Sequence, residues 1–460
     1  MLKLRAAIPV VLLLLAAAVL QPATLSASTC TDDEADSVSL VQDAVDFLRR
    51  LYVEPLTPEM LLVPASAALE EVEERESGVG DPLAEDAFEG EPDEAWAVFA
   101  DQYCTVLQER VVTGAPLDYV VIRAMANAVD EAHTRFLTPE MYREHQAWAA
   151  GESRYEGIGT RLRADPLTVQ YVFPGSPAEA AGLQAGDEIV AIDGVPSSGL
   201  SAQEAVRLVR GEANSLVRLT IVRAGVTETS QYDIIRASIH IPQVESRTID
   251  DVGYLLLRGF PSASLYDDVR SEVESFESLG LNGLVLDLRG NTGGRLDVGA
   301  QVASLFLPEG SPLYQEKTRR GRASIPMTSG DPTWTRPLVV LVDDATASMG
   351  EILAAALQED LGIPLFGTST AGAVAGSIIV PLRDGSALQV TTLRIDSPTG
   401  RLLNGIGVSP DVEFSADAGL MGSGPDEVLD AALEYLRSAA QNNAAAPVAP
   451  ARGELPSPDR

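Results

Sequence analysis

A strand-to-helix pattern lies at residues 340–353, which read VLVDDATASMGEIL. The stretch opens with apolar residues, passes through small and acidic residues, and continues with the apolar spacing of a helix. It predicts a buried strand followed directly by a helix, with Ser348 at the turn between them. Backbone N–H groups at a helix N-terminus stabilise negative charge, so Ser348 has the place of a nucleophile, although an ordinary helix cap has the same appearance.

The residues around this stretch alternate between strand and helix. Apolar runs predict strands at 252–257, 283–288 and 338–342, and the helical spacing recurs at 264–278 and 349–358. This alternation favours a layered α/β core over residues 251–415. Another amphipathic helix is expected at 425–438, before an Ala/Pro-rich tail that its composition predicts to be disordered.

The first part of the chain has helical patterning, and the middle part is rich in short strands. Apolar periodicity predicts helices at 36–72 and 95–129. The acidic segment between them, 73–94, is broken by glycines and prolines and is expected to be an exposed loop. Strands predicted at 167–172, 188–192 and 216–222 surround one helix at 201–210. The change of pattern indicates a different kind of domain from about residue 153.

The N-terminus has the features of a secretory signal. Lys3 and Arg5 precede an apolar stretch at 8–20, and the small residues 26–28 offer a cleavage site. An uncleaved membrane tether is the alternative, and lipid attachment at Cys30 is disfavoured by the residues before it. Cys30 and Cys104 are the only cysteines, and an oxidising compartment would permit a disulfide between them.

Charge excludes several functions. Asp and Glu number 67 against 33 Lys and Arg, giving a net charge of −34, which repels nucleic acid. Only two lysines exist, Lys3 and Lys317, and arginine does not deprotonate to act as a base. Three scattered histidines and two distant cysteines offer no metal-ligand spacing, so neither a metal nor another cofactor is implied.

The middle region resembles the PDZ domains of bacterial proteases. The segments GSPAEAAGL at 175–183 and GDEIVAIDG at 186–194 carry the likeness. The preceding YEGIG at 155–159 is similar to the loop that offers backbone N–H groups to a peptide C-terminal carboxylate in that family. The resemblance implies that Gly157, Ile158 and Gly159 bind a peptide end, added as a strand at the domain edge. A spacer or lid role is the alternative.

Three further motifs resemble those of the C-terminal processing, or tail-specific, serine protease family. They are DLRGNTGG at 287–294, TASMGE at 346–351 and GIGVSPD at 405–411. The resemblance implies an α+β or α/β multidomain protein, with a crotonase-like ββα core, an inserted PDZ-like domain and an N-terminal helical domain. We expect the following division: signal peptide 1–28, helical domain 29–150 with the acidic loop 73–94, PDZ-like domain 151–228, protease core 229–420, C-terminal helix 421–440 and disordered tail 441–460.

The same resemblance implies that Ser348 is the nucleophile, and that the N–H groups of Met349 and of Gly293 or Gly294 line the oxyanion hole. The chain departs from the family in the residue that would act as the general base. Well-known members carry a lysine after the nucleophile helix, and Ala373 occupies that place here.

A serine still needs a base, and His133 is the candidate. Its segment, DEAHTRFL at 130–137, is similar to the D-x-H segment of the family. A histidine from a preceding domain serves as base in the lysine-lacking, tricorn-like branch. A structural role for His133 is equally open, because lysine-containing members have a histidine there too. Asn404 and Glu351 are the two candidates for a group that orients it. His145 and His240 are expected to be structural or exposed.

The expected function is that of an exported, extracytoplasmic serine endopeptidase acting on proteins or peptides with accessible C-termini. A catalytically inactive scaffold that kept the fold after losing the lysine is the main alternative, and a hydrolase of another kind is the second. Cleavage of an unfolded substrate would separate these hypotheses.

Overall fold

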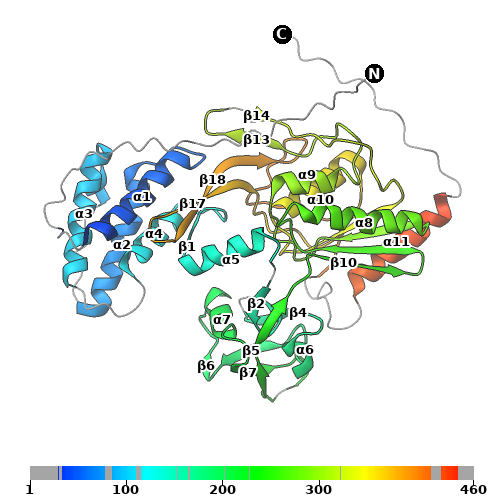
Figure 1. Cartoon of the computed structure of the whole chain (residues 1–460), viewed down its shortest axis with the longest axis horizontal. Helices are drawn as coiled ribbons and strands as arrows, with labels where there is room; N and C mark the ends of the chain where they lie inside the picture. The colour runs from blue at the N-terminus through cyan, green and yellow to red at the C-terminus, as the bar shows by residue number, and fades with distance from the viewer. Residues whose placement is uncertain are drawn as a thin grey trace, which may run out of the picture.

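The computed structural model describes residues 30, 34–77, 85–109, 116–152, 154–163, 166–200, 202–226, 228–321, 323–415 and 426–443. The expected signal peptide, residues 78–84 of the expected acidic loop and residues 444–460 of the tail lie outside this part. Figure 1 shows a helical bundle on the left, a layered α/β body on the right and a small β-rich domain below them.

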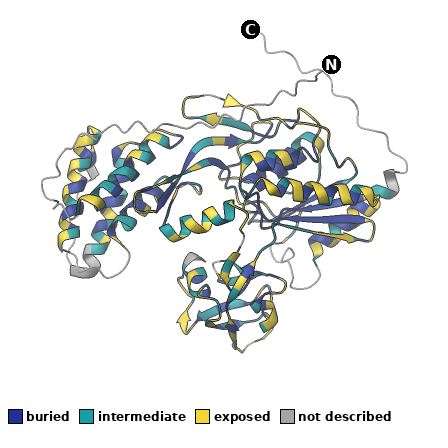
Figure 2. Ribbon diagram, in the orientation of Figure 1, coloured by how far each residue is buried: buried dark blue, intermediate teal, exposed yellow. Residues whose placement is uncertain are grey.

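The layered body is built on one mixed sheet. Its strand order is β10 (Val244–Ile249), β11 (Val252–Leu257), β12 (Gly283–Asp287), β15 (Leu338–Val342), β16 (Leu365–Gly367) and β19 (Val412–Glu413). β10 is antiparallel to β11, and the other neighbours are parallel. Every residue of β11, β12 and β15 is buried, because helices cover both faces of the sheet (Figure 2).

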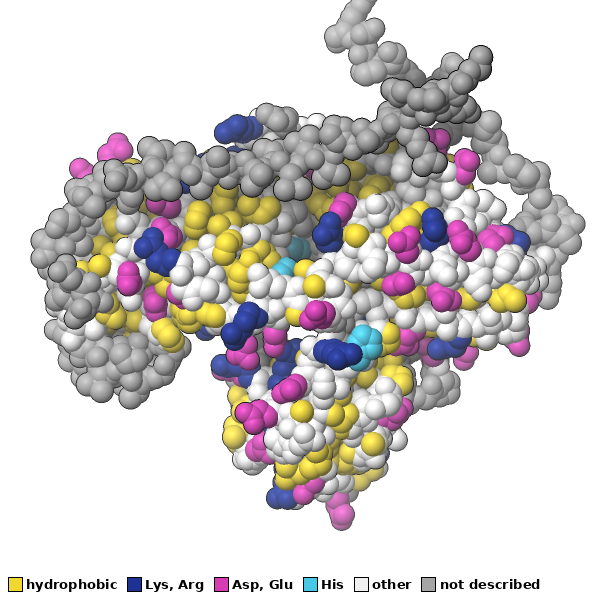
Figure 3. Space-filling model, viewed as in Figure 1, with side chains coloured by type: hydrophobic (Ala, Val, Ile, Leu, Met, Phe, Trp, Pro, Cys, Tyr) yellow, Lys and Arg dark blue, Asp and Glu magenta, His cyan; other side chains and the backbone are white. Residues whose placement is uncertain are grey.

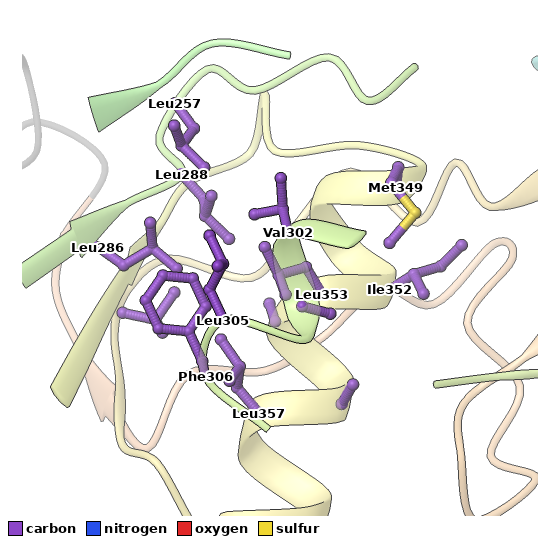
Figure 4. Packing of buried hydrophobic residues seen from close by; sticks show 14 of the residues in the cluster. Leu257, Leu286, Leu288, Val302, Leu305, Phe306, Met349, Ile352, Leu353 and Leu357 are labelled. Atoms are coloured by element: carbon purple, nitrogen blue, oxygen red, sulfur yellow. The ribbon is translucent and has the colours of Figure 1, made fainter. Parts of the chain in front are cut away.

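Alternate residues of these strands supply two separate cores. Leu255, Leu286 and Val340 point to the face covered by α8 (Ser264–Ser278), α9 (Leu296–Ala303) and α10 (Met349–Leu361). Leu256 and Leu341 pack instead with α11 (Glu427–Asn443) on the other face. Figure 4 shows the first core, in which Met349, Ile352, Leu353 and Leu357 of α10 meet strand residues and α9. This packing fixes the N-terminus of α10, where Ser348 lies.

A second sheet joins this body to the helical bundle. It contains β1 (Arg135–Leu137), β13 (Gln315–Thr318), β14 (Ala323–Ser324), β17 (Ala375–Pro381) and β18 (Ala387–Asp396). The β17–β18 hairpin inserts Leu382, Leu388 and Val390 into the bundle core. The bundle consists of α1 (Ala35–Leu51), α2 (Pro58–Ser77), α3 (Pro92–Glu109) and α4 (Leu117–Asn127), with a short 3-10 helix, η2 (Glu85–Phe88). Helix α5 (Pro139–Ala149) follows β1.

The small domain hangs from a two-stranded connector formed by β2 (Arg154–Gly157) and β9 (Ala237–His240). Its sheet contains β3 (Thr160–Arg163), β4 (Thr168–Val172), β5 (Glu188–Ile192), β6 (Val195–Pro196), β7 (Leu216–Val222) and β8 (Ser230–Ile235). Helices α6 (Pro177–Ala181) and α7 (Ala202–Val209) complete it. Asp193 and Gly194, with φ of 49° and 83°, make the tight turn between β5 and β6.

The core strands and helices lie where the apolar patterns predict them, but three expectations outside the core are wrong. The helical stretches expected at 36–72 and 95–129 are each divided in two, the first into α1 and α2 and the second into α3 and α4. The expected loop at 73–94 is partly helical, because α2 continues to Ser77, η2 buries Phe88 in the bundle and α3 begins at Pro92. The C-terminal helix runs to Asn443 and so includes the first residues of the expected tail.

Cys30 and Cys104 form a disulfide, which ties the N-terminal segment to α3. The sequence permits this pairing without requiring it. No helix in the described ranges is long and apolar enough to cross a bilayer.

Candidate active site

Ser348 stands at a strained turn between β15 and α10. Its φ is 54° and its ψ is −120°, a backbone conformation that a non-glycine residue rarely adopts. A serine held this way between a strand and a helix matches the nucleophile elbow of other serine hydrolases. The side chain is only slightly exposed, at 9% for the residue, but it reaches a cleft.

The DLRGNTGG loop is bonded directly to this turn. The Asp343 carboxylate accepts hydrogen bonds from the Gly290 N–H at 2.7 Å and the Ala345 N–H at 3.1 Å. Burial raises the pKa of Asp343. The Ala347 N–H donates to the Asn291 carbonyl at 2.8 Å. The loop and the nucleophile turn are thereby held in one fixed arrangement.

The first residues of the loop have a different role, because they bind the C-terminal helix. Buried Arg289 donates to both oxygens of Asp287 and both oxygens of Asp426, next to the start of α11. The Tyr254 hydroxyl donates to Asp287 at 2.8 Å. These groups satisfy one another's charges inside the fold, so the DLR part of the motif is structural.

The three predicted oxyanion residues all lie beside Ser348 or on the cleft, and they are not equivalent. A Cβ on Gly293 would come within 2.5 Å of the Ser348 Cβ, so only glycine fits there. The Gly293 N–H already donates to Asn291 Oδ1 at 2.9 Å. Gly294 lines the cleft with Ser348. Met349 opens α10, and an N–H in the first turn of a helix has no partner within that helix.

Glu351 binds the loop in which Ala373 replaces the family lysine. Its carboxylate accepts from Thr370 Oγ1 at 2.5 Å, from the Gly372 and Ala373 N–H groups at 2.8 and 2.9 Å, and from the Ser348 N–H at 3.0 Å. Burial raises the pKa of Glu351 despite these bonds. Asn404 Oδ1 accepts from the Val374 N–H at 3.1 Å in the same loop. The structure therefore brings neither Glu351 nor Asn404 to His133.

Glu131 is the residue that contacts His133, and the sequence reasoning missed it. One Glu131 oxygen lies 3.2 Å from His133 Nδ1 and accepts from the His133 backbone N–H at 2.9 Å. The other accepts from the Thr134 and Thr391 hydroxyls. Burial raises the pKa of Glu131, but the bonds from His133 and Thr391 outweigh it, so the pKa is lowered. The signal was available, since Glu131 lies two residues before His133.

Ser348 and His133 line one large cleft of about 1150 Å³. The cleft lies between the second sheet, helix α5, the PDZ-like domain and the layered body. His145 of α5, which is partly exposed, lines it too. Burial, followed by the nearby charge of Arg135, lowers the pKa of His145. His240 lies in β9 and lines a different, smaller cavity.

No lysine is among the described residues that line this cleft. Lys317 lies in β13, is half exposed and pairs with Asp396 at 3.2 Å. Within the described part of the chain, no three His, Cys, Asp or Glu side chains come together in a way that could hold a metal ion. The described side chains that share the cleft with Ser348 include His133 and several arginines.

The predicted carboxylate loop lies where β2 leads into β3. The Ile158 carbonyl accepts from the Ala178 N–H, and the Gly159 carbonyl accepts from the Phe173 N–H. Gly159 has φ of 84°, and a Cβ there would overlap Ser176. The neighbouring Tyr155 lines the active-site cleft, whereas Gly157, Ile158 and Gly159 are buried and are not among its lining residues.

Comparison with known proteins identifies the class first. Residues 251–414 match the peptidase family S41, and residues 168–223 match the PDZ domain. The molecule is therefore a peptidase core that carries a PDZ domain, as the motifs predict.

Relatives then give the family. A carboxyl-terminal-processing protease of Synechocystis sp. is 37% identical over 302 residues, which are 64% of this chain and 70% of that protein. One from Picosynechococcus sp. is 33% identical, over 69% of this chain and 78% of that protein. A solved photosystem II D1 C-terminal processing protease superposes with a TM-score of 0.58 at 27% identity, covering 85% of this chain and 98% of the other. The chain belongs to the carboxyl-terminal-processing proteases of peptidase family S41.

Proposed function

We propose that this protein is an exported serine endopeptidase that engages accessible C-termini through its PDZ domain and cleaves by an acyl-enzyme route. The observation that carries the proposal is the sharing of one cleft by Ser348, at its strained helix N-terminus, and the His133–Glu131 pair. This pair supplies a base where Ala373 removes the family lysine.

The proposed catalytic steps use the groups that line or adjoin this cleft. Ser348 Oγ attacks the peptide carbonyl as His133 Nε2 takes its proton, with Glu131 on Nδ1 fixing the tautomer. The N–H groups of Met349 and Gly294 stabilise the oxyanion, since the Gly293 N–H is bonded to Asn291. The protonated His133 then returns its proton to the leaving amine. Water, deprotonated by His133, hydrolyses the acyl-enzyme and regenerates Ser348.

The PDZ domain would deliver the substrate. The loop from Gly157 to Gly159 is proposed to receive the C-terminal carboxylate on its backbone amides. The peptide would add as a strand beside β3, which ends its sheet and faces α7. In this proposal the domain division is the one given by the motifs: a helical domain at 29–150, a PDZ domain at 151–228 and a protease core at 229–420.

Export is supported by two features. The N-terminus carries a charged, apolar and small-residue succession typical of a signal. The Cys30–Cys104 disulfide would persist in an oxidising compartment. We propose an extracytoplasmic location, with a membrane tether only if the signal is not removed.

The experiment is cleavage of an unfolded protein with an apolar C-terminus by the purified mature protein. Ser348→Ala and His133→Ala are each expected to lose at least about 10³-fold in kcat. His240→Ala is the matched control, because His240 lies outside the cleft, and it is expected to keep full activity. His145→Ala decides between the two cleft histidines. Loss of activity in His145→Ala with retention in His133→Ala would contradict the assigned base.

The absence of the family lysine favours one second function, a binding protein that no longer cleaves. The specific observation is Ala373 in the loop held by Glu351. If the wild-type protein binds the apolar C-terminus of the test substrate without cleaving the substrate, the binding function is established and the peptidase function is overturned.

A further inference from the structure

The active-site cleft has a charge opposite to that of the whole chain. The chain carries a net charge of −34. Among the described residues that line the cleft, arginines outnumber carboxylates by six to three. The arginines are Arg135, Arg154, Arg161, Arg210, Arg258 and Arg295. The carboxylates are Glu144, Glu152 and Asp297. Figure 3 shows basic side chains gathered where the PDZ domain meets the rest of the molecule.

Three of the six arginines are neutralised by direct partners. The pairs are Arg210 with Glu144 at 2.9 Å, Arg258 with Glu245 at 2.8 Å and Arg295 with Asp297 at 2.6 Å. Two of the three carboxylates that line the cleft, Glu144 and Asp297, form these ion pairs. The other three arginines and one carboxylate, Glu152, remain, so the balance in the cleft is still positive.

No direct ion pair joins these three, Arg135, Arg154 and Arg161, to a carboxylate of the described ranges, although Asp343 and Asp344 lie close enough to Arg161 to act on its charge. Arg135 Nε donates to the amide oxygen of Gln389 at 2.9 Å. Arg161 Nη2 donates to the Gly290 carbonyl at 2.8 Å, in the loop that leads to Gly294. Arg154 is exposed at the start of β2. The three side chains come from three strands, β1, β2 and β3, so their charge borders the cleft on more than one side.

We propose that this cleft selects acidic peptide segments, whose Asp and Glu side chains pair with Arg135, Arg154 and Arg161. The inference rests on the proposed function and adds the substrate class to it. A cleft of one sign inside a low-dielectric wall concentrates ligands of the opposite sign and raises their association rate. Arginine pairs with carboxylates through two parallel N–H bonds, which adds geometric selection.

The acidic surface outside the cleft limits which kinds of anion can bind in the cleft. An extended polyanion such as nucleic acid would meet repulsion as soon as it left the cleft. A single peptide strand whose carboxylates lie within the cleft gains the attraction and avoids most of the repulsion. A peptide is also what a PDZ domain delivers to the same space.

The test compares three peptides that are identical except for the residues around the cleaved bond, which carry Asp and Glu, Asn and Gln, or Lys. Measured at low salt with wild-type protein, kcat/KM is expected to be at least about ten-fold higher for the acidic peptide than for its amide counterpart. The advantage should shrink as ionic strength rises, because exposed charges are screened. Equal rates for the acidic and amide peptides would overturn the inference and leave the proposed function standing.

Variants locate the source of the preference. The double substitution Arg135→Gln/Arg154→Gln should remove most of it while the amide peptide is still cleaved. The control Arg270→Gln/Arg437→Gln removes the same number of positive charges outside the cleft, on α8 and α11, and should leave the preference intact. A preference that survives the double substitution would refute the assignment.

Binding separates this inference from the proposed function. Fluorescence anisotropy with Ser348→Ala measures the affinity for the labelled acidic and amide peptides without turnover. Tighter binding of the acidic peptide supports the inference even if wild-type protein cleaves nothing, an outcome that would defeat only the proposed function. Equal binding of the two peptides would count against the inference in either case.

Discussion

At the scale of single residues, Glu131 is the most informative side chain. We expect Glu131→Gln to lower kcat by about 10² to 10⁴-fold, because an amide cannot fix the His133 tautomer as a carboxylate does. KM for a short peptide should change little. Steady-state kinetics check this, and Asp130→Asn is the matched control: it removes the adjacent carboxylate, which does not contact His133, and asparagine tolerates the φ of 46° at that position. A Glu131→Gln protein as active as the control would remove Glu131 from the mechanism.

The same residue gives a pH dependence. The folded-state pKa of Glu131 is lowered, so its stabilising contribution is complete above the unfolded value of about 4.3 and is lost as pH falls through the lower folded value. Denaturation at pH 7 should find Glu131→Gln less stable by about 1–3 kcal/mol. The gap between wild type and variant should close below about pH 4. A gap that stayed constant down to pH 3 would mean that Glu131 is not bonded as an ion.

The sequence could supply some of these residues and not others. Ser348 follows from local rules, since a strand, a turn and a helix are contiguous in the chain. Glu351 and Asn404 were the candidates for orienting His133 because they lie in or beside the family motifs, but their carboxylate and amide oxygens accept bonds from the loop at 370–374. The D-x-H motif points to His133 and does not specify a role for Glu131, so the motif alone did not predict that this carboxylate contacts the histidine.

At the scale of elements, Glu351 joins the start of α10 to the loop that carries Ala373. Replacing it with alanine would leave the Thr370 hydroxyl and the N–H groups of Gly372 and Ala373 without this acceptor, whereas the Ser348 N–H would keep its bond to the Ala373 carbonyl. Each orphaned buried donor costs about 1–3 kcal/mol, although water entering the gap would recover part of it. We expect Glu351→Ala to be less stable by about 3 kcal/mol or more, as measured by denaturant unfolding, and to lose most of its activity. Glu359→Ala, which removes an acid near the end of the same helix, should have a smaller effect on activity.

Elements also show where sequence patterns succeed. Strands β11, β12 and β15 are buried on both faces, and their unbroken apolar runs predict this burial. The prediction for the acidic segment at 73–94 was wrong because its charge, glycines and prolines are typical of a loop along its whole length. One buried side chain, Phe88, is enough to place η2 against the bundle, and a single aromatic residue carries no periodicity.

At the scale of the whole molecule, the cleft exists only where distant segments meet. His133 comes from the turn between α4 and β1, Ser348 from the layered body and Arg161 from the PDZ domain. Each segment has its own local signal, but the charge of the cleft does not, because its arginines are scattered from residue 135 to residue 295. A chain with a net charge of −34 gave no reason to expect a basic site. Long-range packing creates this property, so it became visible only in three dimensions.

The disulfide acts at this largest scale. It joins Cys30 to the fully buried Cys104 over 74 residues and so encloses α1 and α2. Closing a loop of this length restricts the unfolded chain and typically contributes about 2–4 kcal/mol. Cys30→Ser/Cys104→Ser should therefore unfold at a lower temperature than wild type, and a reductant should lower the melting temperature of the wild type but not of the variant. Peptide cleavage at 25 °C should be unchanged, because neither cysteine lines the cleft. If the reductant does not change the melting temperature of the wild type, the disulfide does not stabilise the bundle. One of the two arguments for an extracytoplasmic location would then be lost.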